Sequence, residues 1–173
     1  MRHLMLILVL ALLSACTVPA QDLGRLTLSA GPLFQRNITY GVTSVGGLVG
    51  FEGYFHKNAG VYLGFSRSYA KYKNLIDITG YGVLFGPVFR FPNRANITPF
   101  VGILGGMGGS SAGFLNTSVS VTTRSLTVAG GVDWELSPHV AVRVISIGFG
   151  QVWAEGSEHE TGVSIGPALV FRF

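Results

Sequence analysis

Bulky apolar and small residues alternate in eight long segments of this sequence, and this alternation restricts the possible folds more than any other feature. Side chains of a β-strand point alternately to its two faces, so a period of two predicts strands. Segment 80–91 shows this clearly, because Tyr81, Val83 and Phe85 alternate with glycines and one leucine. We expect strands at about 25–35, 44–55, 60–70, 78–91, 98–107, 123–136, 139–151 and 162–173.

The lengths of the segments and of their connections point to a membrane. Most segments have 10–14 residues, more than the five or six of an ordinary strand and enough to cross a tilted bilayer. Short connections at 56–59, 92–97 and 137–138 alternate with longer polar ones at 36–43, 71–77, 108–122 and 152–161. This asymmetry is typical of bacterial outer-membrane barrels, and an even strand number places both termini in the periplasm.

The two faces of the segments differ in charge. The bulky face is almost free of charged residues, whereas the small face carries the few that the strands contain. A soluble barrel would show its polar face to water and bury its apolar face inside. The sequence therefore predicts an all-β, eight-stranded, antiparallel up-and-down transmembrane β-barrel in the bacterial outer membrane. The alternative is a lipid-anchored periplasmic binding protein of lipocalin type.

The N-terminus has the pattern of a secretory leader. Residues 4–13 are a ten-residue apolar run, too short to span a bilayer. Two cleavage sites compete: residues 13–16 resemble the lipobox of bacterial lipoproteins, with Cys16 as the lipidated residue, and Ala20 ends an ordinary signal-peptidase site. We expect a signal peptide over 1–20 and the barrel over 21–173.

Alternation places seven charged residues inside the barrel, near the periplasmic ends of the strands. An eight-stranded barrel is just wide enough for side chains to fill it, and unpaired charges there would be costly. We expect a salt-bridged plug that closes the lumen; the alternative is a gated ion path. The seven residues are Arg25, Glu52, Arg90, Asp133, Glu135, Arg143 and Arg172.

The outward face predicts two aromatic girdles, as at the two interfaces of a membrane. The periplasmic girdle would contain Phe89, Phe91, Trp134, Phe171 and Phe173, and the outer one Phe34, Tyr69, Tyr81, Phe149 and Trp153. A Gly-Pro pair recurs at 31–32, 86–87 and 166–167. Because proline removes a ladder donor, we expect bulges or register breaks there.

The chain resembles the small eight-stranded outer-membrane barrels of the porin superfamily, which include the outer-membrane protein A membrane domain and the Ail/Lom-type virulence proteins. The resemblance rests on the leader, the strand count, the loop asymmetry and the C-terminal sequence Val170-Phe171-Arg172-Phe173. It implies recognition of the last strand by the barrel-assembly machinery. It specifies architecture more than function, because one fold serves many functions.

No residue pattern predicts catalysis. Outside the leader the histidines are His56, His139 and His159, and none has a serine two positions away on a membrane-facing strand. The loop Ser157-Glu158-His159-Glu160 is read as solvated. The sequence predicts no cofactor, no metal site and no nucleic-acid binding. We expect a non-enzymatic barrel with a structural or surface-interaction role; the alternative is a lipid-modifying barrel enzyme.

Two outer segments are candidate contact sites. Arg67, Lys71 and Lys73 lie near Tyr69 and Tyr72, a combination suited to lipopolysaccharide phosphates. The uncharged segment 108–122 is where we expect a partner, since loops vary without disturbing a scaffold. We expect a monomer surrounded by outer-membrane lipids and lipopolysaccharide.

Overall fold

The computed structural model describes residues 26–72, 76–92, 96–114, 117–154 and 159–173. The predicted leader, with Cys16, lies outside the described residues, and so do Arg25 and Lys73. No helix among the described residues is long and apolar enough to cross a membrane.

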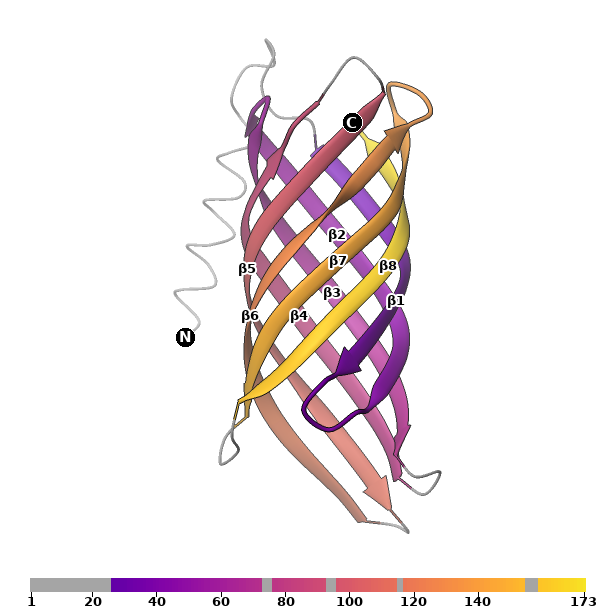
Figure 1. The fold of residues 1–173 in the computed structure, drawn as a ribbon, viewed down its shortest axis with the longest axis vertical. Coiled ribbons are helices and arrows are strands. Elements are labelled where there is room, and N and C mark those ends of the chain that lie inside the picture. The colour runs from indigo at the N-terminus through magenta and orange to yellow at the C-terminus, as the bar shows by residue number, and fades with distance from the viewer. Residues whose placement is uncertain (1–25, 73–75, 93–95, 115–116, 155–158) are drawn as a thin grey trace.

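The described residues form one closed, antiparallel, up-and-down barrel of eight strands (Figure 1). Each strand pairs with the next, and β8 pairs with β1 to close the sheet. The predicted fold class is thereby confirmed. The strands are β1 (Leu26–Asn37), β2 (Thr43–His56), β3 (Ala59–Tyr72), β4 (Ile76–Arg90), β5 (Ile97–Phe114), β6 (Thr117–Glu135), β7 (Val140–Ala154) and β8 (Glu160–Arg172).

The barrel has two unlike ends. The terminal end carries Leu26, Arg172, the connections 57–58 and 136–139, the end of β4 and the start of β5. The distal end carries the connection 38–42, the ends of β3, β5 and β7, and the starts of β4, β6 and β8. In the first distal connection Asn37 N donates to Val42 O at 2.8 Å, and Gly41 has a φ of 69°, which favours glycine.

The expectation of a long loop at 108–122 is wrong. β5 runs to Phe114 and β6 starts at Thr117, and these two residues are paired. The polar composition concealed a strand, since serine, threonine and glycine alternate there with Val119 and Val121. Backbone pairing between two strands does not need apolar side chains on both faces. The result is a long β5–β6 hairpin that projects at the distal end (Figure 1).

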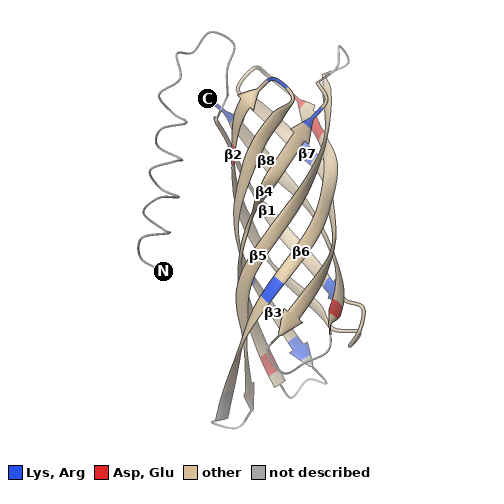
Figure 2. Cartoon of the chain, turned by 90° about the vertical axis from the view of Figure 1, so that its left-hand side faces the viewer, with Lys and Arg blue, Asp and Glu red and all other residues tan. Residues whose placement is uncertain are grey.

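The outer wall is apolar between the two ends. All ten residues of the two predicted girdles are exposed, including Trp134 near the terminal end and Tyr81 near the distal end. Between the girdles, Phe51, Phe65 and Phe85 also point outward and are exposed. Figure 2 shows the charged strand positions gathered toward the two ends of the barrel, with an uncharged middle. An exposed apolar band of this kind is suited to lipid rather than to water.

The three Gly-Pro pairs differ in whether the strand register shifts beside them. Pro32 and Pro87 interrupt the β1–β8 and β4–β5 ladders without a register shift, so the expectation of a bulge is wrong at these two sites. Pro167 lies opposite a true irregularity, because the β7–β8 register shifts between Arg143 and Ser146.

The irregularity in β7 is a bulge at Val144. On the β6 side, Val132 pairs with Ile145 while the next residue, Asp133, pairs with Arg143. One extra residue reverses the alternation, so Val144 and Ile145 are both exposed while Arg143 and Ser146 both line the lumen. The bulge therefore allows Arg143 and Ser146 both to face the lumen.

Candidate functional site

The terminal half of the lumen is occupied by a network of buried ion pairs centred on Arg143. Its Nε lies 2.7 Å from Asp133 Oδ1, and its Nη2 lies 2.8 Å from Glu52 Oε1. All three residues are buried, with 2% to 4% of their surface exposed. A guanidinium with two carboxylates in hydrogen-bonding geometry retains its charge in such a place, because strong contacts replace its hydration.

A second arginine extends the network toward the terminal end. Arg172 Nη1 lies 2.6 Å from Glu135 Oε1, and its Nη2 lies 3.6 Å from Asp133 Oδ2. Thr98 Oγ1 also donates to Glu135 at 2.6 Å. Asp133 therefore joins the two arginines, and β6, β7, β8 and, through Glu52, β2 are connected across the lumen.

Aromatic side chains pack against the charged groups. Tyr54 donates its hydroxyl to Glu52 Oε2 at 2.6 Å, and the Arg90 guanidinium lies 3.8 Å from the centre of its ring. The Arg143 guanidinium lies 4.0 Å from the centre of the Phe100 ring. A cation over an aromatic face is stabilised most where water is absent. Charge and aromatic surface thus fill this half together.

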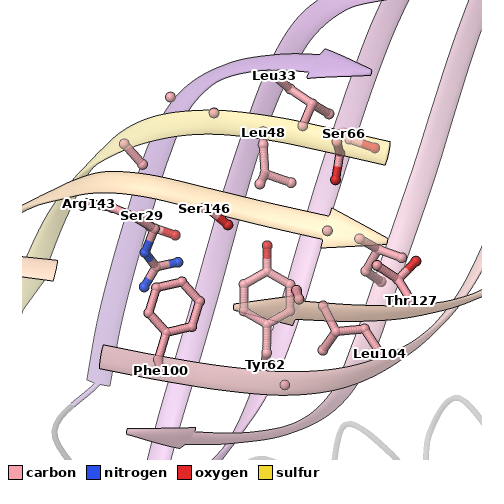
Figure 3. Close-up of a pocket in the computed structure, with 18 of the residues that line it drawn as sticks. Ser29, Leu33, Leu48, Tyr62, Ser66, Phe100, Leu104, Thr127, Arg143 and Ser146 are labelled. Atoms are coloured by element: carbon pink, nitrogen blue, oxygen red, sulfur yellow. The ribbon is translucent and has the colours of Figure 1, made fainter. Parts of the chain in front are cut away.

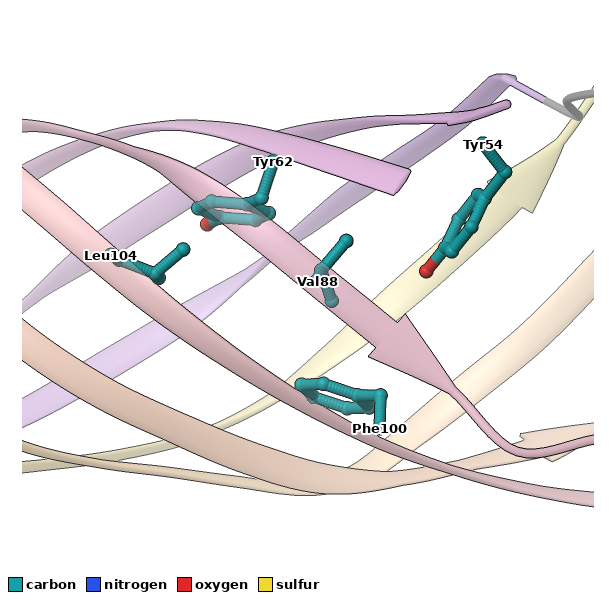
Figure 4. Close-up of a cluster of buried hydrophobic side chains, with 5 residues drawn as sticks. All are labelled: Tyr54, Tyr62, Val88, Phe100 and Leu104. Carbon is teal, nitrogen blue, oxygen red and sulfur yellow. The ribbon is translucent and has the colours of Figure 1, made fainter. Parts of the chain in front are cut away.

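Buried apolar and aromatic side chains pack together in the same half of the lumen as the ion-pair network. Tyr54, Tyr62, Val88, Phe100 and Leu104 form one buried cluster (Figure 4). They come from β2, β3, β4 and β5, opposite the strands that carry most of the ion pairs.

Glycines make room for the large rings. A methyl group at Gly50 or Gly64 would collide with the Tyr62 ring and hydroxyl, and one at Gly131 would lie 2.8 Å from the Phe100 ring. The three glycines stand on β2, β3 and β6 and face the lumen. Large and small side chains therefore complement each other in this half.

The distal half of the lumen is hollow. A cavity of about 380 Å³ opens at the distal end, and hydroxyl and glycine residues line most of it. Below it lies a second, smaller cavity of about 80 Å³ between Leu33, Leu48, Leu84 and Leu104. Tyr62, Phe100 and Arg143 also line this smaller cavity (Figure 3). The lumen therefore changes from polar and wide to apolar and narrow before it meets the ion pairs.

Of the seven charges predicted for the lumen, six are placed together at its terminal end: Glu52, Arg90, Asp133, Glu135, Arg143 and Arg172. Arg25 lies outside the described residues. The six comprise three cations and three anions, so the cluster is neutral. Sequence reasoning missed Tyr54, Tyr62, Thr98 and Phe100. Tyr54 was detectable, because it stands two residues after Glu52 and so shares its face.

The basic residues predicted to contact lipopolysaccharide lie on the outer wall near the distal end. Arg67 is exposed, with its guanidinium 5.1 Å from the centre of the Tyr69 ring. Lys71 lies 3.8 Å from Asp77, and both side chains are largely exposed. Arg36 and Arg124, not selected from the sequence, are exposed as well. Alternation places both on the outward face, a signal that sequence reasoning could have used.

The histidines are scattered. His56 is exposed at the terminal end of β2, the Nδ1 of His139 lies 3.2 Å from Arg172 O, and His159 is exposed at the distal end. Ser157 and Glu158 of the loop read as solvated lie outside the described residues. Within the ranges that the structure describes, no group of three or more His, Cys, Asp or Glu residues could hold a metal ion.

Comparison with solved structures places this barrel among known outer-membrane barrels. Neisserial surface protein A is similar with a TM-score of 0.69 at 11% identity, over 87% of this chain and 97% of that one. Ail, the attachment invasion locus protein of Yersinia pestis, gives 0.60 at 20% identity, over 87% and 99%. The N-terminal β-barrel domain of Pseudomonas aeruginosa OprF gives 0.54 at 11% identity, over 87% and 99%.

These likenesses define the fold. The chain has the architecture of the small eight-stranded bacterial outer-membrane barrels, as the resemblance in the sequence implied. No protein-family model and no curated protein matches the sequence. What the protein does must therefore be argued from its own geometry.

Proposed function

We propose that this protein is a non-enzymatic surface-interaction barrel of the bacterial outer membrane, which binds an extended polypeptide segment along the free edge of β6 and keeps its lumen closed. The observation that carries the proposal is the length of the β5–β6 hairpin. β6 pairs with β5 from Thr117 onward, whereas its pairing with β7 begins only at Thr123.

The candidate edge is residues 117–122, of sequence Thr-Ser-Val-Ser-Val-Thr. In the register of the β6–β7 ladder, residues 155–158 would lie opposite 119–122, and they lie outside the described residues. Within the described ranges, no other strand pairs with this edge. An unpaired edge offers a row of backbone donors and acceptors to another strand. Natural proteins usually protect such edges with lysine, proline or bulges. This one has two valines and two threonines, which favour strands, and neither lysine nor proline.

The other strand of the hairpin, β5, supports this assignment of the edge. β5 is paired on both sides, with β4 at Asp77–Gly113 and with β6 at Phe114–Thr117. An incoming strand can therefore be added beside β6 but not beside β5. The neutrality of 117–122 favours an uncharged extended segment as partner.

The terminal half supports a closed lumen. An ion would have to pass the narrow cavity lined by four leucines and then displace Arg143 from Glu52 and Asp133. Apolar constrictions exclude water and ions, and buried ion pairs resist disruption. This arrangement supports a plug rather than the gated path that the sequence also allowed.

The outer wall supports contact with lipopolysaccharide. Arg36, Arg67 and Arg124 point outward near the distal girdle, where Tyr69, Tyr81 and Trp153 are exposed. Guanidinium groups hydrogen-bond phosphate in a bidentate manner, and the aromatic rings fit the interface. Lys71, at the distal end of β3, adds a further cation beside Asp77 of β4. Because lipopolysaccharide occupies the outer leaflet, the proposed contact implies that the terminal end faces the periplasm. There the barrel-assembly machinery would act on β8.

The edge proposal is tested with a fluorescent ten-residue peptide of alternating threonine and valine, titrated into the full chain in lipid nanodiscs. We expect saturable binding that falls about tenfold in Ser120→Lys, because a charged edge residue disfavours strand addition. The matched control is Ser111→Lys. Ser111 is the direct cross-strand partner of Ser120 and lies on the same face, but its own strand is paired on both sides.

An equal loss in both variants would indicate a general effect of charge on the hairpin and contradict binding at the edge. The closed lumen is tested separately in planar bilayers. We expect no ion conductance from the wild-type protein at moderate voltage, and a stable conductance step would overturn the plug.

Contact with lipopolysaccharide is tested by reconstitution. Wild type and the triple variant R36Q/R67Q/R124Q are compared for retention of lipopolysaccharide during purification in mild detergent. We expect the variant to retain much less, whereas equal retention would contradict a role for the three arginines. The Lys57→Gln variant, at the terminal end, serves as the control for loss of charge.

A further inference from the structure

The distal half of the lumen contains a polar cavity that the surface-interaction function does not use. Its mouth is surrounded by Gln35, Arg36, Asn37, Tyr40 and Glu160, which come from β1, β8 and the connection between β1 and β2. Deeper in, serine and threonine side chains line the wall: Ser44, Ser66, Ser68, Ser110, Thr123, Ser125, Thr127 and Ser164.

The hydroxyl groups are available to a ligand. Ser66 donates only a long hydrogen bond, 3.5 Å, to Gly82 O. Elsewhere in this wall, within the described ranges, the side chains of Ser44, Ser68 and Ser110 form no hydrogen bond with another protein group. Each hydroxyl both donates and accepts, so a ring of them matches a molecule that presents hydroxyls in several directions.

The mouth adds a planar polar group and an aromatic ring. Asn37 Nδ2 donates to Glu160 Oε2 at 2.6 Å, while Asn37 Oδ1 accepts from Tyr40 N at 3.1 Å. These bonds fix the amide and the carboxylate side by side, and among the described residues no protein group bonds to Glu160 Oε1. The Tyr40 side chain is 55% exposed and lines the cavity, so its ring offers an apolar face with a polar tip.

Charge and shape restrict the ligand further. Of the two charged residues that line the mouth, Arg36 points outward, which leaves Glu160, and the wall below them has no charged residue among those that line it. A strongly charged ligand would therefore gain no partner inside. Below the cavity of about 380 Å³ lies a smaller one of about 80 Å³ between four leucines, so only one end of a longer ligand has room inside.

We infer that this cavity binds the terminal residue of a neutral glycan chain, with Asn37, Glu160 and the serine hydroxyls bonding to sugar hydroxyls and the Tyr40 ring packing on the sugar face. The site is independent of the β6 edge, because residues 117–122 do not line it. A concave site with a few convergent polar groups and an aromatic wall is the usual form of a small-ligand site.

The test uses the full chain in nanodiscs and saturation-transfer NMR with two neutral probes, maltotriose and the trimer of N-acetylglucosamine. We expect at least one of them to bind, with saturation transfer strongest at its non-reducing or reducing terminal residue. Tyr40→Ala and Ser68→Leu should each weaken binding about tenfold, the first by removing the ring and the second by filling the cavity.

Tyr69→Ala is the matched control, because Tyr69 is a similarly exposed tyrosine but lies on the outer wall. Each variant is first shown to fold by its heat-dependent mobility in SDS electrophoresis. Absence of binding by both neutral probes overturns the inference. So does an equal loss in Tyr69→Ala, or preferential binding of a sulfated trisaccharide that persists in Tyr40→Ala and Ser68→Leu.

Discussion

The two halves of the lumen are built on the same strands and are both rich in glycine. They differ in the side chains that stand beside those glycines. In the terminal half, glycines stand beside large rings, as Gly50 and Gly64 stand beside Tyr62. In the distal half, glycines stand beside hydroxyls: the nearest group to a methyl at Gly80 would be Ser68 Oγ at 2.9 Å, and at Gly82 it would be Ser66 Oγ at 3.1 Å. The first half is filled and the second is hollow.

The comparison shows that the wall of a small barrel does not decide whether its interior is solid. That depends on a few large side chains. Tyr54, Tyr62 and Phe100, together with two arginines, occupy the space that glycine leaves in the terminal half. Stability should therefore be concentrated in the terminal half, whereas the distal half is free to bind. Substitutions in the terminal half should therefore cost more stability than substitutions in the distal half.

Removal of Arg143 should have the largest effect. Arg143→Leu leaves Glu52 and Asp133 buried without their main counter-charge, and breaking a buried pair in this way costs about 3–5 kcal/mol. Urea unfolding of the protein in lipid vesicles measures the loss. Arg124→Leu, on the outer wall, should change the free energy of unfolding far less. A loss below about 1 kcal/mol for Arg143→Leu would contradict the central role of the network.

The next effect concerns one hydrogen bond within the network. Tyr54→Phe removes the hydroxyl that donates to Glu52 Oε2 at 2.6 Å and keeps the ring under Arg90. Hydrogen bonds to charged groups contribute about 1.5–3 kcal/mol, so the free energy of unfolding should fall by that amount. The double variant Tyr54→Phe with Glu52→Gln should lose less than the sum of the single losses, since the two groups interact directly. Strict additivity would argue against the contact.

The third prediction compares equivalent glycines in the two halves. Gly64→Ala should destabilise the barrel by about 1–3 kcal/mol, because the added methyl meets the Tyr62 ring in a filled region. Gly80→Ala should cost much less, because the group it meets is the rotatable hydroxyl of Ser68. Both are lumen-facing strand positions, so strand propensity is matched. Equal losses would remove the distinction between the halves.

The smallest effect is expected where the cavity is widest. Ser68→Leu adds a large side chain to the distal half and should change the free energy of unfolding by no more than about 0.5 kcal/mol, because there is space for it. Thermal unfolding followed by circular dichroism is sufficient for this comparison. A loss as large as that of Gly64→Ala would show that the distal half is packed after all.

The alternation of the sequence was sufficient to predict the barrel, its strand number and the face of nearly every residue. Its main failure, the extended β5–β6 hairpin, has a physical cause. Beyond the apolar band neither face of a strand needs to be apolar, so segment 108–122 lost the pattern while it kept its backbone pairing. Composition alone cannot separate such a strand from a loop.

The charged residues of the lumen were predictable because alternation assigns each to a face, and the cost of burial then requires partners. The particular pairs were not predictable. The contact of Glu52 with Arg143 depends on how two strands distant in sequence meet across the lumen, and the contact of Asp133 with Arg143 depends on the bulge in β7. The distal cavity was not predictable either, because a run of glycine and serine is compatible with a filled or an empty interior.

The bulge at Val144 also bears on how the barrel closes during assembly. A period of two repeats along every strand, so a slip of two residues would leave each side chain on its proper face. Val144 breaks that equivalence, because the ladders to β6 and to β8 both shift beside it. If β7 were shifted by two residues, Val144 would no longer lie beside the Asp133–Arg143 pair of the β6 ladder or opposite Pro167 of β8. A single inserted residue thus makes one register of this barrel different from all the others.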